Sequence, residues 1–413
     1  MSAPELPKAK QPAVLCVQDG ARLHYAIPRA LQQLGWLERV FSDFLIRPGS
    51  LDAMIASLGK NKGPLGAGRM QERRCVEIQD RVVSYPLRSL LWRLRRKNFA
   101  AVEDYYEWLS CQSAQWMSKQ DFGSANLAHG FIRNLHPDFC ETCHDRGIRI
   151  VGDQMIAPAA IEEKEMERQR HRWPTWEAEK AHDSKRLISF EEKTWEHLDH
   201  LTCASDYVRD GLVSCGVSAE RITVLPYPAP DFQALDIDDS KIGKLLRVGF
   251  VGSVNLRKGA PVFLEMARRL NADGVEFMMV GPLAVTSSAI DSLQKHVKLT
   301  GPVPRSKVSD YLNSFDVFLF PSVCEGSAGV VMEALAAGLP VVTTPNSGTV
   351  VRHGIEGFVH DPDDLDGMEV SLKKLLEDRS LREQCANAAK SRSKSYSIAS
   401  YQEGMAQLLP TLL

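Results

Sequence analysis

Two glutamates stand eight residues apart in the segment CEGSAGVVMEALAAGLP, which covers residues 324–340. Glu325 precedes a small-residue turn, and Glu333 lies among aliphatic residues on a predicted helix that ends at Gly338. The dipole of that helix favours an acid near its N-terminus by about 0.3 to 1 kcal/mol, which accounts for Glu325. It does not account for Glu333, because an unpaired buried carboxylate is costly. A pair of ligand hydroxyls, such as a nucleotide ribose presents, would satisfy Glu333.

A second candidate site is the segment GSVNLRKG, residues 252–259, which directly follows a predicted strand and precedes a predicted helix. Glycines let a ligand approach the backbone, and a helix N-terminus favours an anion. Arg257 and Lys258 add positive charge, so the segment could hold a diphosphate. Its spacing matches neither of the common phosphate-binding fingerprints, and a glycine-rich turn with solvated basic residues is the alternative. The full set of expected ligand-binding residues is Gly252, Ser253, Arg257, Lys258, Gly281, Ser327, Ala328, Gly329, Val330 and Glu333.

An alternation of strands and helices must position these residues. From Leu246 onward, short apolar runs ending in Gly, Pro or Ser are each followed by an amphipathic segment of helix length. This order predicts parallel strands covered on both faces, and the first half of the chain repeats it less regularly. In such sheets ligands bind at the carboxyl ends of the strands, so we expect the chemistry to lie between the two halves.

The proline-rich and then acidic stretch after Tyr227 is typical of a linker. We therefore expect an α/β protein with two doubly wound, Rossmann-like domains that face each other across a cleft. The boundaries are an N-terminal domain over residues 1–228, a linker over 229–244 and a C-terminal domain over 245–395. Residues 396–413 are expected to cross back to the first domain as a closing helix.

The overall composition is that of an ordinary globular protein. The 413 residues are 44% hydrophobic and 25% charged, which argues against a disordered chain or a membrane bundle. A formal net charge of −2 provides no general attraction to nucleic acid. The N-terminus lacks the apolar run of a secretory signal, and the nine scattered cysteines fit reduced thiols. We expect a cytoplasmic protein.

Two short motifs suggest cofactors but have simpler interpretations. Residues 140–144, CETCH, match the spacing of a haem attachment site, and a covering helix is the alternative. The pairs Asp236/Asp238 and Asp361/Asp363 resemble an Asp-x-Asp metal site. The first pair falls in the expected linker, and the second is typical of a turn before a helix that follows Asp366. We predict no cofactor and no required metal.

The second half resembles the donor-binding domain of the family 4 glycosyltransferases, which have the GT-B fold. The resemblance rests on the Glu-x7-Glu pattern of Glu325 and Glu333, on Lys258-Gly259 after the first strand, and on GPVPRSKVSDYLNSFDVFLFPS. It covers about residues 246 to 395. In the first half, SDYVRDGLVSCGVSAERITVLPYPAP resembles the segment that leads these enzymes into their linker.

The resemblance implies a retaining transferase that uses a UDP- or GDP-sugar without a metal. Glu333 would bind the ribose, Lys258 the diphosphate, and Glu325 the sugar ring near the reacting carbon. The implied partners are the nucleotide-sugar donor and a glycan, lipid-linked or small-molecule acceptor, as in polysaccharide biosynthesis. A nucleotide-sugar epimerase or hydrolase, and a nucleotide-sugar-binding protein without catalysis, are the alternatives.

The acceptor half departs from the family pattern. Many members carry Arg where this chain has Ser253, and Arg257 is the expected substitute. Many also place a histidine where this chain has Gly152-Asp153, and Asp153 is the candidate for that catalytic position. Further candidates on the acceptor side are Gly20, His24 and His129.

Residues 85–99, YPLRSLLWRLRRKNF, mix leucine and tryptophan with five basic residues. Such a helix suits an interface with anionic lipid, which would place the protein at the inner face of the membrane. A half-buried helix with a solvated basic face is the alternative, and a nucleic-acid site is not expected.

Overall fold

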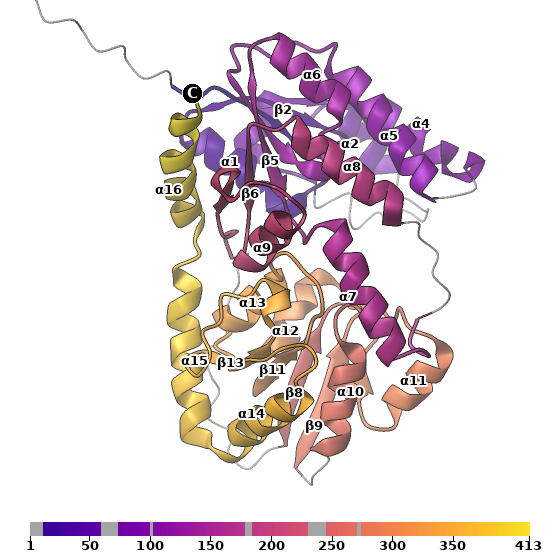
Figure 1. Ribbon diagram of the computed structural model, residues 1–413, viewed down its shortest axis with the longest axis vertical. Coiled ribbons are helices and arrows are strands. Elements are labelled where there is room, and N and C mark those ends of the chain that lie inside the picture. The colour runs from indigo at the N-terminus through magenta and orange to yellow at the C-terminus, as the bar shows by residue number, and fades with distance from the viewer. Residues whose placement is uncertain (1–10, 59–72, 100–101, 178–183, 230–244, 271–273) are drawn as a thin grey trace, which may run out of the picture.

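The computed structural model describes residues 11–58, 73–99, 102–177, 184–229, 245–270 and 274–413. Two parallel β-sheets, each covered by helices, form an upper domain from the first half of the chain and a lower domain from the second half (Figure 1). This arrangement confirms the α/β fold of two doubly wound domains that the alternating pattern predicts.

The first domain is built on a seven-stranded sheet in the order β3-β2-β1-β4-β5-β6-β7. Each residue of β1 is buried because helices cover both faces, with Val14 and Cys16 in one apolar cluster and Leu15 and Val17 in the other. Its strands are β1 (Val14–Val17), β2 (Leu37–Ser42), β3 (Val82–Ser84), β4 (Leu127–Phe131), β5 (Arg149–Gln154), β6 (His200–Cys203) and β7 (Ile222–Val224). Its helices are α1 (Ala26–Gln33), α2 (Leu51–Leu58), α4 (Pro86–Leu94), α5 (Val102–Met117), α6 (Pro137–Asp145), α7 (Ala159–Arg172), α8 (Ser184–Glu196) and α9 (Asp206–Ser214).

The second domain has a six-stranded sheet in the order β10-β9-β8-β11-β12-β13. Its core includes Phe250, Phe318 and Phe320, whose rings stack with centroids 5.5 and 6.0 Å apart. The strands are β8 (Leu246–Val251), β9 (Val275–Val280), β10 (Lys298–Leu299), β11 (Val317–Phe320), β12 (Val341–Thr343) and β13 (Gly357–Val359). The helices are α10 (Ala260–Arg269), α11 (Ser287–Gln294), α12 (Val308–Leu312), α13 (Gly329–Ala336), α14 (Leu365–Glu377) and α15 (Arg379–Lys394), and α15 is followed by α16 (Ile398–Leu408).

Helix α16 crosses back to the first domain, as expected. Figure 1 shows α15 beside the lower domain and α16 continuing upward beside the upper one. Tyr401, Met405 and Leu409 belong to the apolar cluster on the α1 side of the first sheet. The expected linker cannot be assessed, because residues 230–244 lie outside the described part of the chain.

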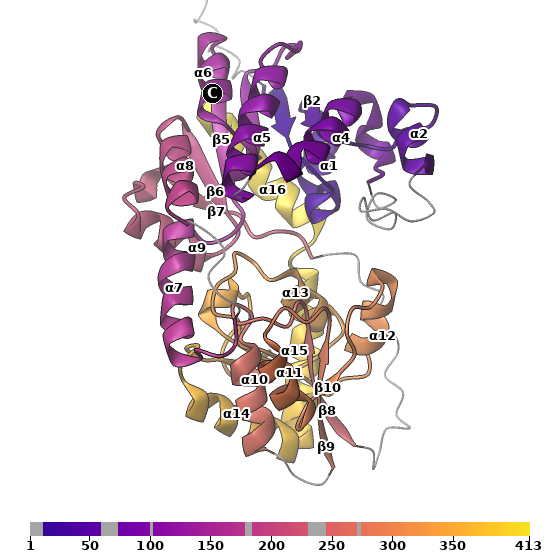
Figure 2. The ribbon, with the colours of Figure 1, turned by 90° about the vertical axis from the view of Figure 1, so that its right-hand side faces the viewer.

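Helix α7 also connects the domains, which the sequence does not predict. Its sequence position belongs to the first domain, yet it extends down beside the second (Figure 2). Arg168 and Arg172 both form ion pairs with Asp363, at 2.5 Å each. Met166 and Trp176 join the apolar core of the second domain. The first domain therefore sends residues 159–177 onto its neighbour.

Candidate functional site

The two domains touch where loops at the carboxyl ends of the two sheets meet. Ser205 Oγ donates a hydrogen bond of 2.6 Å to the carbonyl oxygen of Gly326. A Cβ atom added at Gly326 would lie 1.8 Å from the carbonyl oxygen of Met155, just beyond β5. Glu325 and Gly326, which follow β11, therefore lie against the first domain. This is the edge at which the sequence predicts the chemistry.

A charged group forms the centre of this edge. Lys258 Nζ lies 2.5 Å from Glu325 Oε1, and Arg257 Nη1 lies 3.1 Å from the same oxygen. Arg257 also donates to the carbonyl oxygen of Cys324 at 2.7 Å and approaches Glu162 of α7 at 3.8 Å. Burial lowers the pKa of Lys258, and the adjacent Glu325 opposes that shift. Lys258 and Arg257 therefore share Glu325, and Arg257 also has the more distant Glu162 as a partner, so an anionic ligand would compete with these two carboxylates for the cations.

Helix α13 begins beside this group and adds a second feature suited to anions. No side chain caps its N-terminus at Ala328, whose backbone N–H donates to the carbonyl oxygen of Ser347 at 3.0 Å. Gly329 has no heavy atom within 4 Å of the place where a Cβ would be. Ser327 and Val330 are half-buried beside it. Free N–H groups and the helix dipole attract negative charge at such an end.

Glycines bring the loops around the site close together. Gly281 has φ +142°, and a Cβ there would lie 2.0 Å from the carbonyl oxygen of Gly252. Gly259 has φ +76° and approaches the carbonyl oxygen of Pro321 equally closely. Gly252 and half-buried Ser253 follow β8 directly. These glycines pack one loop on another, which adds a structural role to the ligand contact predicted for Gly252 and Gly281.

Glu333 is buried, as expected, but it is not unpaired. Arg305 grips both of its oxygens: Nη1 donates to Oε2 at 2.9 Å, and Nη2 donates to Oε1. The side chain of Glu333 is 5% exposed and that of Arg305 is 48% exposed. Glu333 therefore does not depend on ligand hydroxyls for a partner, because Arg305, at the start of the short helix Arg305–Lys307, already binds it.

Asp153 does not reach the site. It is 1% exposed in β5, and it accepts hydrogen bonds from Thr202 Oγ1 at 2.8 Å and from the Tyr227 hydroxyl. Burial raises its pKa to about 6 against the effect of these two bonds. Gly152, where family members carry a histidine, is packed so closely that a Cβ would lie 2.3 Å from Leu198 Cδ1. The structure gives Asp153 a structural role in the first domain rather than the catalytic position expected for it.

The other acceptor-side candidates differ in their surroundings. His129 is 1% exposed in β4, and neither ring nitrogen has a hydrogen-bond partner among the described residues. Burial lowers its pKa to about 4, so it is an uncharged core residue rather than a cleft residue. Gly20 and His24 follow β1 at the carboxyl edge of the sheet, and His24 is exposed there. These two remain available to a substrate.

A polar cluster near Gly20 was missed by sequence reasoning. Asp43 accepts from the backbone N–H of Gly20 at 2.9 Å, from Arg73 at 2.6 Å and from Arg93 at 2.7 Å. Asp19, whose side chain accepts from the backbone N–H of Asp43, is half-buried and also accepts from the Tyr85 hydroxyl at 2.9 Å, and its pKa is raised to about 7, chiefly by burial. A cavity of about 20 Å³ adjoins the two arginines, which suffices for water but not for a sugar. The partners of Asp43 come from distant parts of the chain, so no local motif predicts the cluster.

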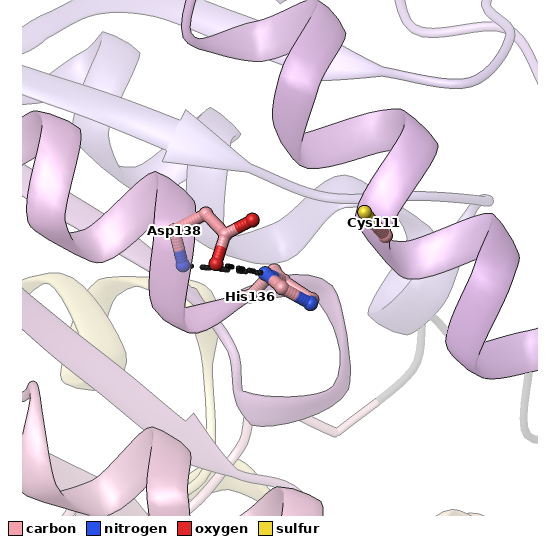
Figure 3. A group of neighbouring side chains, drawn as sticks. All are labelled: Cys111, His136 and Asp138. Atoms are coloured by element: carbon pink, nitrogen blue, oxygen red, sulfur yellow. Dashed lines mark hydrogen bonds and ion pairs between the residues drawn. The ribbon is translucent and has the colours of Figure 1, made fainter.

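The motifs that suggested cofactors have structural explanations. Cys140 and Cys143 are fully buried on α6 in an apolar cluster, so the CETCH segment is a covering helix. Cys111, His136 and Asp138 have ligand atoms within 4.8 Å of one another (Figure 3). His136 Nδ1, however, accepts from the backbone N–H of Asp138 at 3.2 Å and so caps α6. That nitrogen's lone pair is already engaged.

The second Asp-x-Asp pair, Asp361 and Asp363, takes part in a turn and in ion pairs. Asp361 accepts from the backbone N–H of Asp363 in a turn, and Asp363 binds the arginines of α7. The cap of α14 is Asp364 rather than a residue of this pair, and the helix begins at Leu365. Asp236 and Asp238 lie outside the described residues.

The fold and the site together define the GT-B class of two-domain proteins. The full chain resembles the Anabaena protein Alr3699/HepE, solved in complex with UDP and glucose, with a TM-score of 0.63 and 13% identity. That likeness covers 97% of this chain and 100% of the other.

Residues 246–378 match the family model of the group 1 glycosyl transferases, so the second domain is a glycosyltransferase group 1 domain. The amylovoran biosynthesis glycosyltransferase AmsK of Erwinia amylovora is 30% identical over 180 residues, which are 40% of this chain and 44% of AmsK. The capsular polysaccharide biosynthesis glycosyltransferase CapM of Staphylococcus aureus is 28% identical over 208 residues, which are 44% of this chain and 54% of CapM. The chain thus spans about half the length of the curated relatives it matches.

Proposed function

We propose that this chain is a retaining, metal-independent glycosyltransferase that uses a nucleotide diphosphate sugar, with the donor in the second domain and the acceptor in the first. The observation that carries the proposal is the group of Lys258, Arg257 and Glu325 beside the uncapped start of α13, at the interface of the domains. The similarity to CapM, named for capsular polysaccharide biosynthesis, and to AmsK, named for amylovoran biosynthesis, supports a role in polysaccharide biosynthesis.

In this proposal, each group has a defined part in the reaction. Lys258, Arg257 and the dipole of α13 stabilise the diphosphate as the bond between it and the sugar's anomeric carbon breaks. The electron pair of that bond passes to the diphosphate oxygen, and the sugar becomes oxocarbenium-like. The acceptor hydroxyl attacks from the face the diphosphate leaves and gives its proton to the departing diphosphate. Glu325 lies beside the sugar ring, so Glu325→Gln should slow transfer.

A thermal-shift panel of UDP-, GDP- and ADP-sugars tests the donor class. The correct nucleotide should raise the melting temperature markedly at concentrations well above its Kd, because it binds the folded state alone. Wild-type protein that no nucleotide sugar stabilises would contradict the proposal.

Product analysis then separates transfer from the two rival functions. Turnover of the donor alone would indicate an epimerase or hydrolase. Binding without turnover of donor and candidate acceptors would indicate a nucleotide-sugar-binding protein without catalysis.

We also propose that α4 contacts the inner face of a membrane. Leu87, Leu91 and Leu94 are 51, 59 and 61% exposed, and their spacing places them on one helix face. The opposite side of α4 packs on the first domain, where Trp92 is buried and Arg93 binds Asp43. Arg88, Arg95 and Lys97 are exposed and complement anionic lipid. None of the helices in the described ranges is long and apolar enough to cross a bilayer.

A further inference from the structure

Arg22 is a half-buried arginine at the carboxyl edge of the first sheet that has only weak partners. It opens the short turn Arg22–Tyr25 that follows β1. Its Nη1 lies 3.7 Å from Met155 Sδ, and its Cζ lies 5.6 Å from the centre of the Phe131 ring. Within the described part of the chain, no carboxylate forms an ion pair with it. A thioether and an aromatic face are poor substitutes for an anion.

Three other arginines of the same domain, in contrast, form ion pairs with carboxylates. Arg73 and Arg93 bind Asp43, and Arg133 binds the buried Glu191 at 3.2 Å. Burial lowers the pKa of Arg22 and the positive charge of Arg133 lowers it further, while the charges of Asp19, Tyr227 and Asp43 oppose this shift. A guanidinium that is partly removed from water is stabilised best by an anion in direct contact. Among the described residues, Arg22 has no such ion-pair partner.

The surroundings of Arg22 place it at the interface of the domains. Met155, which its guanidinium touches, is the residue whose carbonyl oxygen packs on Gly326, next to Glu325. The backbone around Arg22 is also constrained. Gln18 Nε2 donates to the Arg22 carbonyl oxygen at 2.9 Å. The next three residues, 23–25, all have φ between 50° and 59°, a conformation that costs non-glycine residues on the order of 1 kcal/mol each.

We propose that Arg22 binds a phosphate group of a substrate in the interdomain cleft, an assignment that rests on the proposed transferase function. The guanidinium fork matches two phosphate oxygens, and the negative charge of the phosphate offsets the positive charge of Arg22. The phosphate belongs either to the diphosphate of the donor or to a phosphorylated acceptor. In both cases it completes, from the first domain, the positive surface that Lys258 and Arg257 begin in the second.

The test compares Arg22→Met with Arg146→Met. Arg146 is a matched control because its guanidinium also stacks on a phenylalanine ring, that of Phe122 at 3.8 Å, and donates only to carbonyl oxygens. It precedes β5 and so lies at the opposite edge of the sheet. Isothermal titration gives the Kd of UDP, GDP and ADP for each protein. Thermal shift then measures stabilisation by inorganic phosphate and pyrophosphate, with and without saturating nucleotide.

A rise of about tenfold or more in the nucleotide Kd of Arg22→Met alone assigns the phosphate to the donor. An unchanged nucleotide Kd, with loss of the stabilisation by added phosphate in the nucleotide-saturated protein, assigns it to the acceptor. The inference is overturned if Arg22→Met matches wild type and Arg146→Met in both measurements. Should wild type bind no nucleotide, the transferase proposal fails, while the phosphate measurement on the free protein still decides the role of Arg22. Arg22→Lys, which keeps the charge without the fork, serves if Arg22→Met does not fold.

Discussion

At the residue scale, the pair of Arg305 and Glu333 changes how nucleotide binding should be understood. The buried carboxylate of Glu333 is stabilised by a charged, bidentate partner rather than left open. Arg305 begins the short helix Arg305–Lys307, and its side chain is 48% exposed. If ribose hydroxyls bind Glu333, as the family resemblance implies, donor binding competes with this ion pair.

Replacing Arg305 with alanine should therefore have opposite effects on stability and affinity. The free protein should lose about 1 to 2 kcal/mol, because Glu333 is left buried without a partner. Nucleotide should then stabilise Arg305→Ala more than wild type, because its hydroxyls fill the vacant position. Urea denaturation with and without UDP or GDP measures both effects.

The companion variant Glu333→Gln should weaken nucleotide binding, because an amide is a poorer acceptor for two hydroxyls. Equal nucleotide affinity in wild type and Glu333→Gln would remove Glu333 from the donor site. Reduced affinity in Arg305→Ala would instead mean that Arg305 helps to orient Glu333 in the complex.

His129 is a second residue whose burial has a measurable consequence. Its pKa is lowered from 6.5 to about 4, so the unfolded chain takes up a proton before the folded chain does as the pH falls. The corresponding stability is present in full above about pH 6.5 and is lost as the pH falls toward 4. As the pH falls from about 7.5 to 4.5, the free energy of unfolding of His129→Leu should rise by about 2 to 3 kcal/mol relative to that of wild type. Urea denaturation across that range measures it, with exposed His296→Leu as the control. A constant difference between His129→Leu and wild type would show that His129 does not titrate in this way.

At the element scale, α4 shows how one helix can serve two surfaces. Its inner side holds Trp92 and links Arg93 to Asp43, and its outer side shows three leucines to solvent. Arg95 and Arg96 lie over the rings of Trp108 and Tyr105, so part of the basic charge packs on the protein itself. The exposed leucines therefore test membrane contact more directly than the basic residues do.

Changing Leu87, Leu91 and Leu94 together to glutamine should abolish co-sedimentation with vesicles that contain phosphatidylglycerol. Each exposed leucine that enters the lipid interface contributes about 1 kcal/mol or more, so losing three removes most of the binding. The control is Val370→Gln on α14, because Val370 is 53% exposed on the second domain. Binding that persists in the triple variant, or that is equal for pure phosphatidylcholine vesicles, would count against the membrane surface.

At the scale of the whole molecule, close backbone packing keeps the two domains together around the site. A Cβ at Gly326 would meet the carbonyl oxygen of Met155, and a Cβ at Gly348 would meet that of Gly326. Helix α7 reinforces this contact by binding Asp363 of the second domain. The arrangement of the domains therefore depends on backbone atoms that cannot move aside as a side chain can.

Gly326→Ala should force the domains apart. We expect a larger radius of gyration by X-ray scattering and slower sugar transfer, because the donor and acceptor halves no longer meet. Gly329→Ala is the control for the scattering measurement, since its Cβ would enter open space. An unchanged radius of gyration in Gly326→Ala would mean that the loop accommodates the methyl group locally.

Local sequence patterns determined much of the fold. The alternation of apolar runs with amphipathic segments predicted two parallel sheets, because burial on both faces requires continuous apolar strands. The order of the strands within each sheet was not predicted. The short or charged strands β2, β3 and β10 did not stand out, since six or fewer residues with polar members carry little periodic signal. The sequence also predicted Lys258 and Glu325 as site residues, because strand ends and helix starts are local features, and the structure brings these two side chains together.

Only the tertiary structure decided which charges meet. Glu333 pairs with Arg305, Asp153 accepts a hydrogen bond from Tyr227, and α7 forms ion pairs with Asp363. In each case the partners are farther apart in the sequence than any motif extends. The physical reason is that the energy of a buried charge depends on whatever surrounds it in space, whereas strand and helix patterns depend on neighbours in sequence. Local sequence patterns thus specified the two layered domains and the strand ends at which they meet. The partners of the charged groups at that edge depend on the tertiary structure.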